Sequence, residues 1–547
     1  MTILIILYVS YICCCSIYLF FLLSHMRFIL IKTTRFHSKL APNHYRHRMH
    51  QNGREGRREL NGMNGSVGSA QSARSVGSSP KSVASRLTES NGSTSVPLID
   101  PTEYRSFCFR GEGRMNFVIS AKHANNGSRI VWRFAKARKS GLVTVKAKSE
   151  LVNEYMEKIV SPCLSPNYLV DPKIIEMKVN DVHQLVKIPS LPPNKKIESF
   201  EELLQLPENL SFLPLASIPK NVTRISALEM LDATRIPKEL PEYVGPTITV
   251  EIKPKQGFFQ THPTINVPFC NNCILQMEKT SNNNNVDMEK CQSDTFKQMY
   301  DFCPLQLFSG DFERMRHALQ SLIHIPHRNL RLFVDGNLIH YDEKTLEWGE
   351  LNRALFDRME QKLQEGDEPL KFGIDDILDA LCLIISGSVS FESFALQPHS
   401  VLAQILKAQQ IDSIGIVRAH CMLKQLTDKQ LNELRDKTRI AKIGLQGVLA
   451  LPEDDPLSEL IKYFVAATMK DCSVMVSLRR IPDSSIDSTK LHGNDIIAMP
   501  NGSYFAYSVK VVDLDPKSPK NLTNAYARFM AGVKLIEMNE IQRNPCI

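Results

Sequence analysis

The segment that organises this 547-residue chain reads Glu251-Ile252-Lys253-Pro254-Lys255-Gln256-Gly257-Phe258. In an extended strand, residues two apart point to the same side, so Glu251, Lys253 and Lys255 share one face. Ile252 and Pro254 share the other face, and the strand is expected to end at Pro254 because proline cannot donate to a sheet ladder. Two ammonium groups and a carboxylate at a strand end suit a polyphosphate site. A solvated edge strand would show the same pattern, and these residues alone do not decide between the two.

Periodicity in the rest of the chain predicts a mixed α+β fold. Expected strands cover residues 115–121, 129–135, 247–252, 329–334, 472–478 and 504–514, and expected helices cover 151–160, 312–322, 374–385, 399–407, 415–437 and 522–537. The early strands predict a smaller, β-rich first lobe over residues 99–228. The later elements predict a larger second lobe over residues 229–547, with an additional group of helices.

The first hundred residues have a different composition. Residues 1–24 are apolar and uncharged over about the length of a membrane-spanning helix, and they are either a membrane anchor or a segment that the working protein lacks. Residues 25–98 are rich in Ser, Gly, Asn, Arg and His, which predicts a disordered basic linker. Because basic residues follow the apolar run, an anchor would leave the remainder in the cytosol. We expect a cytoplasmic or nuclear protein, with membrane attachment only through residues 1–24.

Charge is also unevenly distributed along the chain. The net charge is +8, but residues 25–96 hold 12 Lys or Arg and 3 acidic residues, so residues from 97 onward sum to −1. A near-neutral folded part argues against a broad nucleic-acid-binding surface there. A nucleic-acid-binding or lipid-binding arm remains an alternative for the linker alone. Any anion site in the folded part has to be built from local clusters of Lys and Arg.

Glycines and an arginine near the start of the first lobe could bind phosphate. Gly111 and Gly113 precede a strand, where a hairpin tip can bring backbone N–H groups to nucleotide phosphates. Arg133 on the next strand could reach the same phosphates as a fixed cation. An ordinary turn and a surface arginine are the alternative interpretation.

Carboxylates stand at the ends of two late strands. Asp471 precedes the strand at 472–478, and Asp513 and Asp515 follow the strand at 504–512, with both side chains expected on one face. Carboxylates at such positions suit Mg²⁺ coordination and the orientation of an attacking hydroxyl. Exposed turn carboxylates would look the same.

The 13 cysteines lack the even, close spacing of a secreted disulfide domain, which predicts a reducing compartment. Cys270 and Cys273 have the spacing of half a zinc site. The next two cysteines, Cys291 and Cys303, are separated by eleven residues and form no second close pair. Buried or free thiols are therefore expected, and a structural zinc ion is left open.

The run EIKPKQGF at 251–258 resembles a hallmark of the inositol-pentakisphosphate 2-kinase family. Four further segments resemble motifs of that family in the same order along the chain. They are Arg110-Gly111-Glu112-Gly113 with Asn116, CPLQLFSG at 303–310, Lys470-Asp471-Cys472-Ser473, and Asp513-Leu514-Asp515 with Lys517. The resemblance covers about residues 105–540, and five ordered motifs make it specific.

The resemblance implies a two-lobed, kinase-like fold whose larger lobe carries a helical inositol-binding insertion. It implies transfer of the γ-phosphate of ATP, with Mg²⁺, to the 2-hydroxyl of inositol 1,3,4,5,6-pentakisphosphate, which gives inositol hexakisphosphate (phytate). Asp471 would be the base and Lys253 the second catalytic residue, while Asp513 would be the magnesium ligand. The positions that match nucleotide-binding residues are Gly113, Arg114, Met115, Asn116, Arg133, Leu231, Asp232, Ala233, Glu251, Lys253, Arg331 and Asp513. The positions that match substrate-binding residues are Lys255, Lys279, Arg328, Asp471 and Lys517.

Some positions depart from the family pattern. Arg328 stands where a substrate-side Asn is usual, and no Cys-x-x-Cys follows His420 to match the zinc ligands of plant relatives. A substrate-binding Arg of the first lobe has two candidate counterparts, Lys220 and Arg224. Asn521 and Ala525 replace an Arg and a Tyr of plant relatives.

Other functions remain alternatives at this point. The first is a non-catalytic scaffold that binds inositol phosphates. The second is a protein or lipid kinase, although no His-Arg-Asp or Asp-Phe-Gly triplet occurs in the chain. The expected partner is the inositol substrate, no nucleic acid is expected, and the protein is expected to be a monomer.

Overall fold

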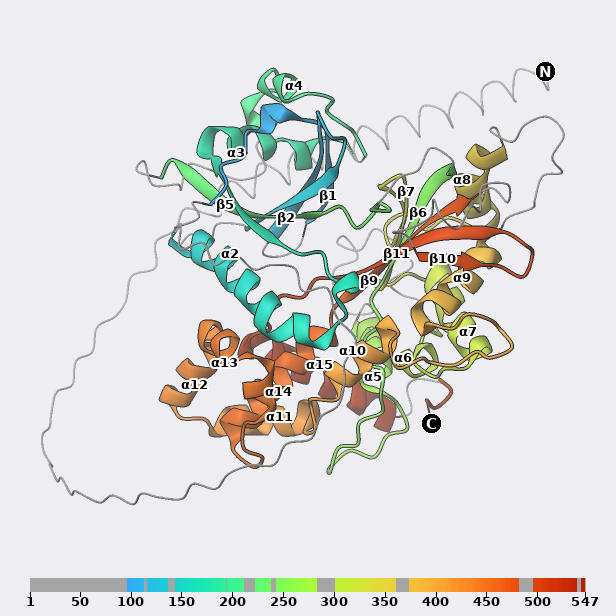
Figure 1. Ribbon diagram of the computed structural model, residues 1–547. Coiled ribbons are helices and arrows are strands. Elements are labelled where there is room, and N and C mark those ends of the chain that lie inside the picture. The colour runs from blue at the N-terminus through green and yellow to red at the C-terminus, as the bar shows by residue number, and fades with distance from the viewer. Residues whose placement is uncertain are drawn as a thin grey trace, which may run out of the picture. The chain divides into compact units, whose positions relative to one another are not determined.

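Two antiparallel sheets organise the part of the chain that the computed structural model describes (Figure 1). The described residues are 96–112, 116–135, 143–192, 194–210, 222–237, 243–282, 301–360, 373–481, 495–538 and 543–546. The apolar segment at 1–24, the linker up to residue 95, the loop residues 113–115, Lys220 and Cys291 lie outside these ranges. Predictions that concern them are therefore not tested by the structure.

The first sheet has the strand order β1-β2-β3-β5-β4. Its strands are β1 Tyr104–Glu112, β2 Asn116–His123, β3 Arg129–Ala135, β4 Lys173–Lys178 and β5 Arg224–Leu231. Its own core is built around Trp132 and Phe107, both fully buried, with Tyr104 edge-on to the Trp132 ring. The strands predicted at 115–121 and 129–135 are confirmed, while β5 continues past the predicted lobe boundary at residue 228.

The second sheet has the strand order β10-β11-β9-β6-β7-β8. Its strands are β6 Val244–Ile252, β7 Leu330–Val334, β8 Asn337–His340, β9 Ser473–Ile481, β10 Asp495–Ala498 and β11 Tyr504–Val512. β6 lies between β7 and β9, and residues 246–250 are all buried, so both faces of the sheet are covered at this strand. Thr249 is satisfied inside this core by a hydrogen bond with the Ser477 hydroxyl at 2.7 Å.

Beyond β6 the predicted alternation appears. Ile252 and Pro254 are buried, whereas Glu251, Lys253 and Lys255 are half-buried. The backbone N–H of Lys253 still bonds to the Asn329 carbonyl at 2.8 Å, so the ladder ends at Pro254 as expected. The predicted alternation of burial is confirmed, but β6 ends at Ile252 and Lys255 has a positive φ of 61°, so the strand geometry behind the predicted shared face does not extend to Lys255.

Fourteen α-helices occur in the described ranges. They are α2 Val143–Tyr155, α3 Val179–Leu185, α4 Phe200–Leu204, α5 Asn271–Asn282, α6 Pro304–Leu307, α7 Phe312–His324, α8 Trp348–Glu360, α9 Ile374–Ser386, α10 Val401–Gln409, α11 Gly415–Gln425, α12 Asp428–Arg435, α13 Lys437–Leu449, α14 Pro456–Met469 and α15 Pro519–Glu537. Seven of them, α8 to α14, follow one another between β8 and β9. Within the residues that the structure covers, no helix is long and apolar enough to cross a membrane.

The single helix predicted over 415–437 is wrong. The chain forms α11, then breaks at Leu426, and α12 begins after Thr427. Thr427 accepts from the Gln430 N–H at 3.3 Å, and the Gln430 side chain accepts from the Thr427 N–H at 3.1 Å. This reciprocal capping box starts a new helix and was hidden by the continuous helical propensity around it.

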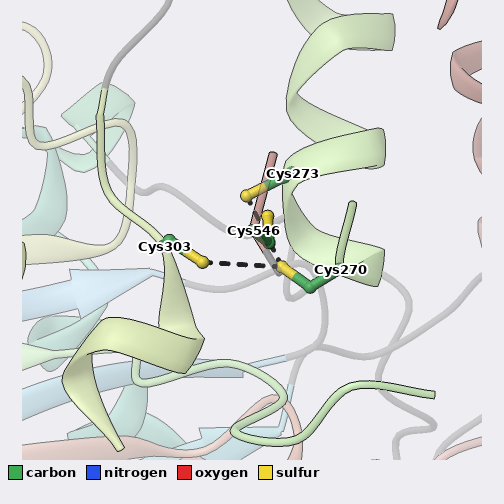
Figure 2. Close-up of side chains that lie close together, drawn as sticks. All are labelled: Cys270, Cys273, Cys303 and Cys546. Carbon is green, nitrogen blue, oxygen red and sulfur yellow. Dashed lines mark hydrogen bonds between the residues drawn. The ribbon is translucent and has the colours of Figure 1, made fainter. Parts of the chain in front are cut away.

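Helix α5 packs against α15 (Figure 1). Gly532 of α15 permits this close approach, because a Cβ there would lie 2.3 Å from the Ile274 carbonyl of α5. Cys270 precedes α5 and Cys273 lies in its first turn, and these two sulfurs meet those of Cys303 and Cys546 (Figure 2). The sequence spacing had offered Cys291 and Cys303 as the nearest partners, so the participation of Cys546 is new.

Candidate active site

A cavity of about 360 Å³ lies along the two sheets. Its walls are largely apolar, with Val118, Val131 and Leu228 from the first sheet and Met475 and Val511 from the second. Binding sites for small organic molecules have volumes of this order and similar apolar walls with a few polar groups. The cavity can therefore take a flat, partly apolar ring system with a polar end.

The described positions that match nucleotide-binding residues all line this cavity. They are Asn116, Arg133, Leu231, Asp232, Ala233, Glu251, Lys253, Arg331 and Asp513. Gly113, Arg114 and Met115 belong to the connection between β1 and β2 and lie outside the described residues. On either side of this connection, β1 and β2 pair as antiparallel strands, with Glu112 opposite Phe117.

The carboxylate of Asp515 holds two of these residues. Its Oδ2 accepts from Asn116 Nδ2 at 3.2 Å and forms an ion pair with Arg133. Arg133 is thus a fixed, largely buried cation on the cavity wall and not a surface residue. Sequence reasoning placed Asp515 in a motif without giving it a role.

Asp232 has a structural function at the end of β5. Its carboxylate accepts from Arg110 at 2.9 Å, from the Ser120 hydroxyl at 2.7 Å and from the Thr234 N–H at 3.0 Å. Burial alone would raise the pKa of Asp232, but Arg110 and the hydrogen bonds from Thr234 and Ser120 lower it to about 2. The side chain therefore links the chain that follows β5 to Arg110 of β1 and Ser120 of β2, and Asp232 lines the cavity together with Leu231 and Ala233.

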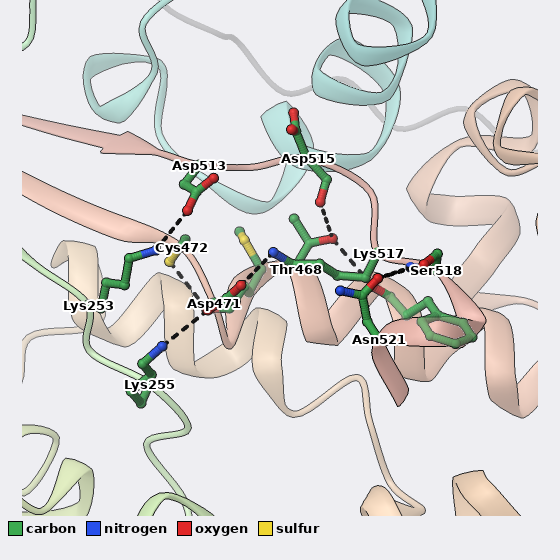
Figure 3. A network of polar contacts seen from close by, with 12 residues as sticks. Lys253, Lys255, Thr468, Asp471, Cys472, Asp513, Asp515, Lys517, Ser518 and Asn521 are labelled. Atoms are coloured by element: carbon green, nitrogen blue, oxygen red, sulfur yellow. Dashed lines mark hydrogen bonds and ion pairs between the residues drawn. The ribbon is translucent and has the colours of Figure 1, made fainter. Parts of the chain in front are cut away.

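Two carboxylate–cation pairs stand at the polar end of the cavity. Glu251 and Arg331 lie opposite each other on β6 and β7, with 3.6 Å between their charged atoms. Lys253 Nζ donates to Asp513 Oδ2 at 2.7 Å (Figure 3). Burial lowers the pKa of Lys253, but Asp513 and Asp471 raise it more, so this lysine stays charged.

Asp471 lies next to this pair and binds two lysines. Its Oδ1 accepts from Lys255 at 3.1 Å and its Oδ2 accepts from Lys517 at 2.7 Å (Figure 3). Burial would raise the pKa of Asp471, but Lys255, Lys517 and Lys253 together hold it well below its usual range. The carboxylate is half-exposed, so a hydroxyl group can approach it.

Asp513 and Asp515 do not share a face as the alternation predicted. The strand β11 ends at Val512, and Asp513 has a positive φ of 64°. This left-handed conformation turns the chain, so Asp513 meets Lys253 while Asp515 meets Arg133. The two carboxylates therefore have separate roles.

A second group of cations lies beyond Lys255. Burial, and then Lys255, Arg528 and Arg328, lower the pKa of Lys279 to about 8. Among the described residues, Lys279 forms no ion pair, whereas Arg528 binds Glu278 at 2.8 Å and Arg328 lies 3.3 Å from Asp342. Repelling cations held together in this way form a site for a multiply charged anion.

Sequence reasoning missed Arg528, although a signal was present. Residues seven apart lie on one face of a helix, and Arg528 is seven residues after Asn521 in α15. Arg528 thus lies on the same face of α15 as Asn521, two turns further along the helix. Arg224, one of the two first-lobe candidates, instead lies on β5 near Glu176 at 3.5 Å.

Gln409 was also missed, and it ties two parts of the site together. This residue of α10 is fully buried and donates to the Lys255 carbonyl at 2.7 Å and the Met469 carbonyl at 3.1 Å. Its side-chain oxygen accepts from the Gly257 N–H at 2.8 Å. Gly257 itself has no room for a side chain, because a Cβ would lie 2.4 Å from the Phe308 ring. Gln409 thus fixes the backbone that carries Lys255 and the helix end that precedes Asp471.

Known proteins resemble this chain over most of its length. Residues 109–528 match the family model described as inositol-pentakisphosphate 2-kinase. A Danio rerio inositol-pentakisphosphate 2-kinase is 24% identical over 496 residues, which cover 78% of this chain and 92% of the relative. The Arabidopsis thaliana protein of the same name is 27% identical over 52% of this chain and 58% of its own length, and the Drosophila melanogaster one is 30% identical over 21% of each. The matched region contains every described residue of the site, and the chain belongs to the inositol-pentakisphosphate 2-kinase family.

Proposed function

We propose that this protein transfers the γ-phosphate of ATP to the 2-hydroxyl of inositol 1,3,4,5,6-pentakisphosphate and releases inositol hexakisphosphate. The observation that carries the proposal is the placement of Asp471 between Lys255 and Lys517, directly beside the Lys253–Asp513 pair. A candidate base, the cations for a polyphosphate and the polar end of a ring-sized cavity are thereby adjacent. Family membership supports the same reaction.

The cavity is the proposed ATP site. Adenine would occupy the apolar part next to Leu231, Asp232 and Ala233, while the phosphates would extend towards Arg133 and Lys253. The loop at 113–115 would cover the phosphates with backbone N–H groups. In this assignment the first sheet belongs to the smaller lobe and the second sheet to the larger lobe of a kinase-like architecture.

Magnesium fits the carboxylate of Asp513. This oxygen ligand is half-exposed and lines the cavity, and Asp515 is less suited because Asn116 and Arg133 already bind it. When bound, the ion supplies charge neutralisation on the transferred phosphate. Lys253, which holds Asp513 at 2.7 Å, orients this carboxylate and adds a second positive charge beside the same phosphate.

The inositol site is the cation cluster beyond Asp471. Lys255, Lys279, Arg328 and Lys517 would bind phosphates of the substrate, and Arg528 extends this set. The cations come from the segment that follows β6, from α5 and α15, and from the loops before β7 and α15. The helices between β8 and β9 contribute the positioning residue Gln409.

Asp471 is the proposed base, and binding of the substrate raises its pKa. Two lysines hold its pKa low in the structure, and a carboxylate with a low pKa is a poor proton acceptor. Phosphates of the inositol compete for Lys255 and Lys517, so binding draws these cations away and raises the pKa of Asp471. Phosphoryl transfer through a loose transition state then needs a positioned hydroxyl and compensated charge more than a strong base.

The test is incubation of the purified full-length protein with ATP, Mg²⁺ and inositol pentakisphosphate, followed by separation of the products. Formation of inositol hexakisphosphate in amounts equal to the ADP released supports the proposal. Absence of the product from a folded protein that binds ATP would overturn it. ADP release without the inositol product would point to a different phosphate acceptor.

A further inference from the structure

A second cavity, of about 430 Å³, shares residues 231–233 with the cavity proposed for ATP. Its remaining walls come from β2, β3 and the turn between them, from the chain that follows β5 and from β11. Among the described residues, the one carboxylate in the lining is Asp232, which Arg110 already binds. Four of the lining residues are cations: Lys122, Arg129, Arg235 and Lys510.

Two of these cations face each other across the first sheet. Lys122 of β2 lies directly opposite Arg129 of β3, and Arg105 of β1 is the partner of Lys122 on its other side. Like charges in directly opposite positions destabilise an antiparallel pair. The Arg129 guanidinium lies 3.5 Å from the Ser106 carbonyl, and within the described ranges neither Lys122 nor Arg129 forms an ion pair. The sheet therefore keeps positive charges together at a cost in stability that no ion pair in these ranges offsets.

The electrostatics of Arg129 agree with this excess of positive charge. Burial, followed by repulsion from Arg235 and Arg110, lowers the pKa of Arg129, and attraction to Asp232 offsets only part of the effect. Arg110 and Asp232 bind each other at 2.9 Å, so as a pair they add little net charge. An anion in the cavity would remove the repulsion around Arg129.

The other two cations are held by partners of their own. Arg235 binds Asp335 with 3.1 Å between the charged atoms, and Lys510 Nζ donates to the Asn167 carbonyl at 2.6 Å. These two side chains add positive charge at fixed positions, whereas the charges of the facing pair on β2 and β3 remain available to a ligand.

We propose that this cavity binds a small, multiply phosphorylated anion, with Lys122 and Arg129 as its main partners. The planar guanidinium of Arg129 can bind two phosphate oxygens at once, and the ammonium of Lys122 adds a point charge beside it. The volume of the cavity lies within the range of small-molecule sites.

Backbone hydrogen bonds connect this anion site to the cavity proposed for ATP. The Asp232 N–H donates to the Arg129 carbonyl at 3.3 Å, and the Arg235 N–H donates to the Asp232 carbonyl at 3.0 Å. An anion held by Arg129 would therefore fix residues 231–233, which line both cavities. This consequence rests on the proposed function, whereas the anion site itself does not.

The test is calorimetric titration of the full-length protein with inorganic tripolyphosphate at fixed ionic strength. The double variant Lys122→Gln with Arg129→Gln should lose one binding site or bind there about 10–100-fold more weakly, because charged hydrogen bonds are lost. The double variant Arg314→Gln with Lys429→Gln is the control, since it removes the same charges from exposed positions on α7 and α12. The control should bind as the unaltered protein does. Equal binding by the two double variants would overturn the proposal.

A second titration, with inositol hexakisphosphate, identifies the source of the phosphates. Loss of the same site for both anions in Lys122→Gln with Arg129→Gln would mean that phosphate groups alone are recognised. Loss for inositol hexakisphosphate alone would assign the site to an inositol phosphate, and loss for tripolyphosphate alone would assign it to a linear polyphosphate.

Thermal unfolding separates ligand binding from a structural role of the two cations. Without added anion, Lys122→Gln with Arg129→Gln should melt at the same temperature as the unaltered protein or higher, because opposed like charges are removed. Arg129→Lys keeps the charge and should retain most of the binding. A lower melting temperature without the anion, or binding lost equally in Arg129→Lys and Arg129→Gln, would contradict a charge-based anion site. None of these measurements needs turnover, so failure of the kinase assay is distinguishable from failure of this proposal.

Discussion

The cavity proposed for ATP and the cation cluster proposed for inositol pentakisphosphate differ in how far their positive charges are neutralised by carboxylates. In the cavity, each cation faces a carboxylate: Arg133 with Asp515, Arg331 with Glu251, and Lys253 with Asp513. In the cluster, Arg328 and Arg528 each have a carboxylate partner, but Lys255 and Lys517 share the single carboxylate of Asp471. Lys279 forms no ion pair within the described residues, so the cluster keeps an excess of positive charge. A nucleotide with a bound metal ion needs a neutral, apolar slot with a polar end. A bare polyphosphate needs uncompensated positive charge, and this excess is what distinguishes the two sides.

The largest expected change in turnover comes from removing the carboxylate of Asp471, which lies between the cavity and the cation cluster. Asp471→Asn should lower turnover by about 10²–10⁴-fold, the usual contribution of a positioned base. It should leave inositol pentakisphosphate binding unchanged or tighter, because one negative charge is lost among three lysines. Initial rates and calorimetric titration measure the two quantities. The control is Asp454→Asn, an almost fully exposed carboxylate far from the cavity lining. Near-normal turnover in Asp471→Asn would remove the residue from catalysis.

Truncating a cation of the cluster should weaken the binding of inositol pentakisphosphate and leave the binding of ATP unchanged. Lys255→Ala should raise the Michaelis constant for inositol pentakisphosphate by about 10–100-fold, as expected from a charged hydrogen bond of about 1.5–3 kcal/mol. The Michaelis constant for ATP should stay within about twofold. Steady-state kinetics with each substrate varied in turn checks both values. Equal increases in the two Michaelis constants would mean that Lys255 contributes to the binding of ATP as much as to that of inositol pentakisphosphate.

Gln409 bonds to the segment that carries Lys255 and to the end of the helix before Asp471. Its replacement should therefore lower both the stability of the protein and the turnover. Gln409→Met keeps the volume but leaves the Lys255 carbonyl and the Gly257 N–H without the Gln409 side chain as partner. It also removes one of the two donors to the Met469 carbonyl, which keeps the Cys472 thiol. We expect unfolding to become easier by about 1–3 kcal/mol, together with slower turnover. Chemical denaturation and initial rates measure these effects, and Gln410→Met, at an exposed neighbour, is the control. Lower stability with unchanged kinetics would limit Gln409 to a packing role.

Filling the apolar cavity should weaken the binding of ATP and leave the binding of inositol pentakisphosphate unchanged. Val131→Phe adds volume on the cavity wall of β3 and should raise the Michaelis constant for ATP about tenfold, equivalent to about 1.4 kcal/mol. Inositol pentakisphosphate binding without nucleotide should not change. Calorimetric titration with each ligand separates these outcomes. Unchanged ATP affinity would mean that adenine does not occupy this part of the cavity.

The smallest expected effect is a pH dependence at Lys279. Burial and neighbouring cations lower its pKa to about 8, so the free protein loses this charge as pH rises through 8. Bound phosphates favour the charged form and raise the pKa, so binding takes up a proton above pH 8 and becomes a few-fold weaker per pH unit. Titrations in buffers of different ionisation enthalpy measure the proton uptake. Lys279→Arg keeps its charge and should remove this dependence; if it persists there, another group is responsible.

Local periodicity was sufficient for the elements whose pattern is governed by one neighbouring surface. The strands β3 and β7, the helices α7 and α9 and the alternation of burial from Glu251 to Lys255 agree with the sequence prediction. α14 was not predicted as a helix, and most of its residues are buried, as are those of α9. Asp513 and Asp515 point in different directions because Asp513 has a positive φ, and the presence of an aspartate in a sequence does not predict this conformation.

The amino-acid sequence alone indicated the family and the reaction class, because five ordered motifs resemble those of the family. It also predicted the alternation of buried and half-buried residues from Glu251 to Lys255, since this pattern is local. Only the tertiary structure decided which charges meet. Asp471 meets Lys255 across 216 residues, Lys253 meets Asp513 across 260, and Cys546 joins Cys303 and the start of α5. These contacts depend on the packing of segments that are distant in the chain, and no local pattern of residues records that packing.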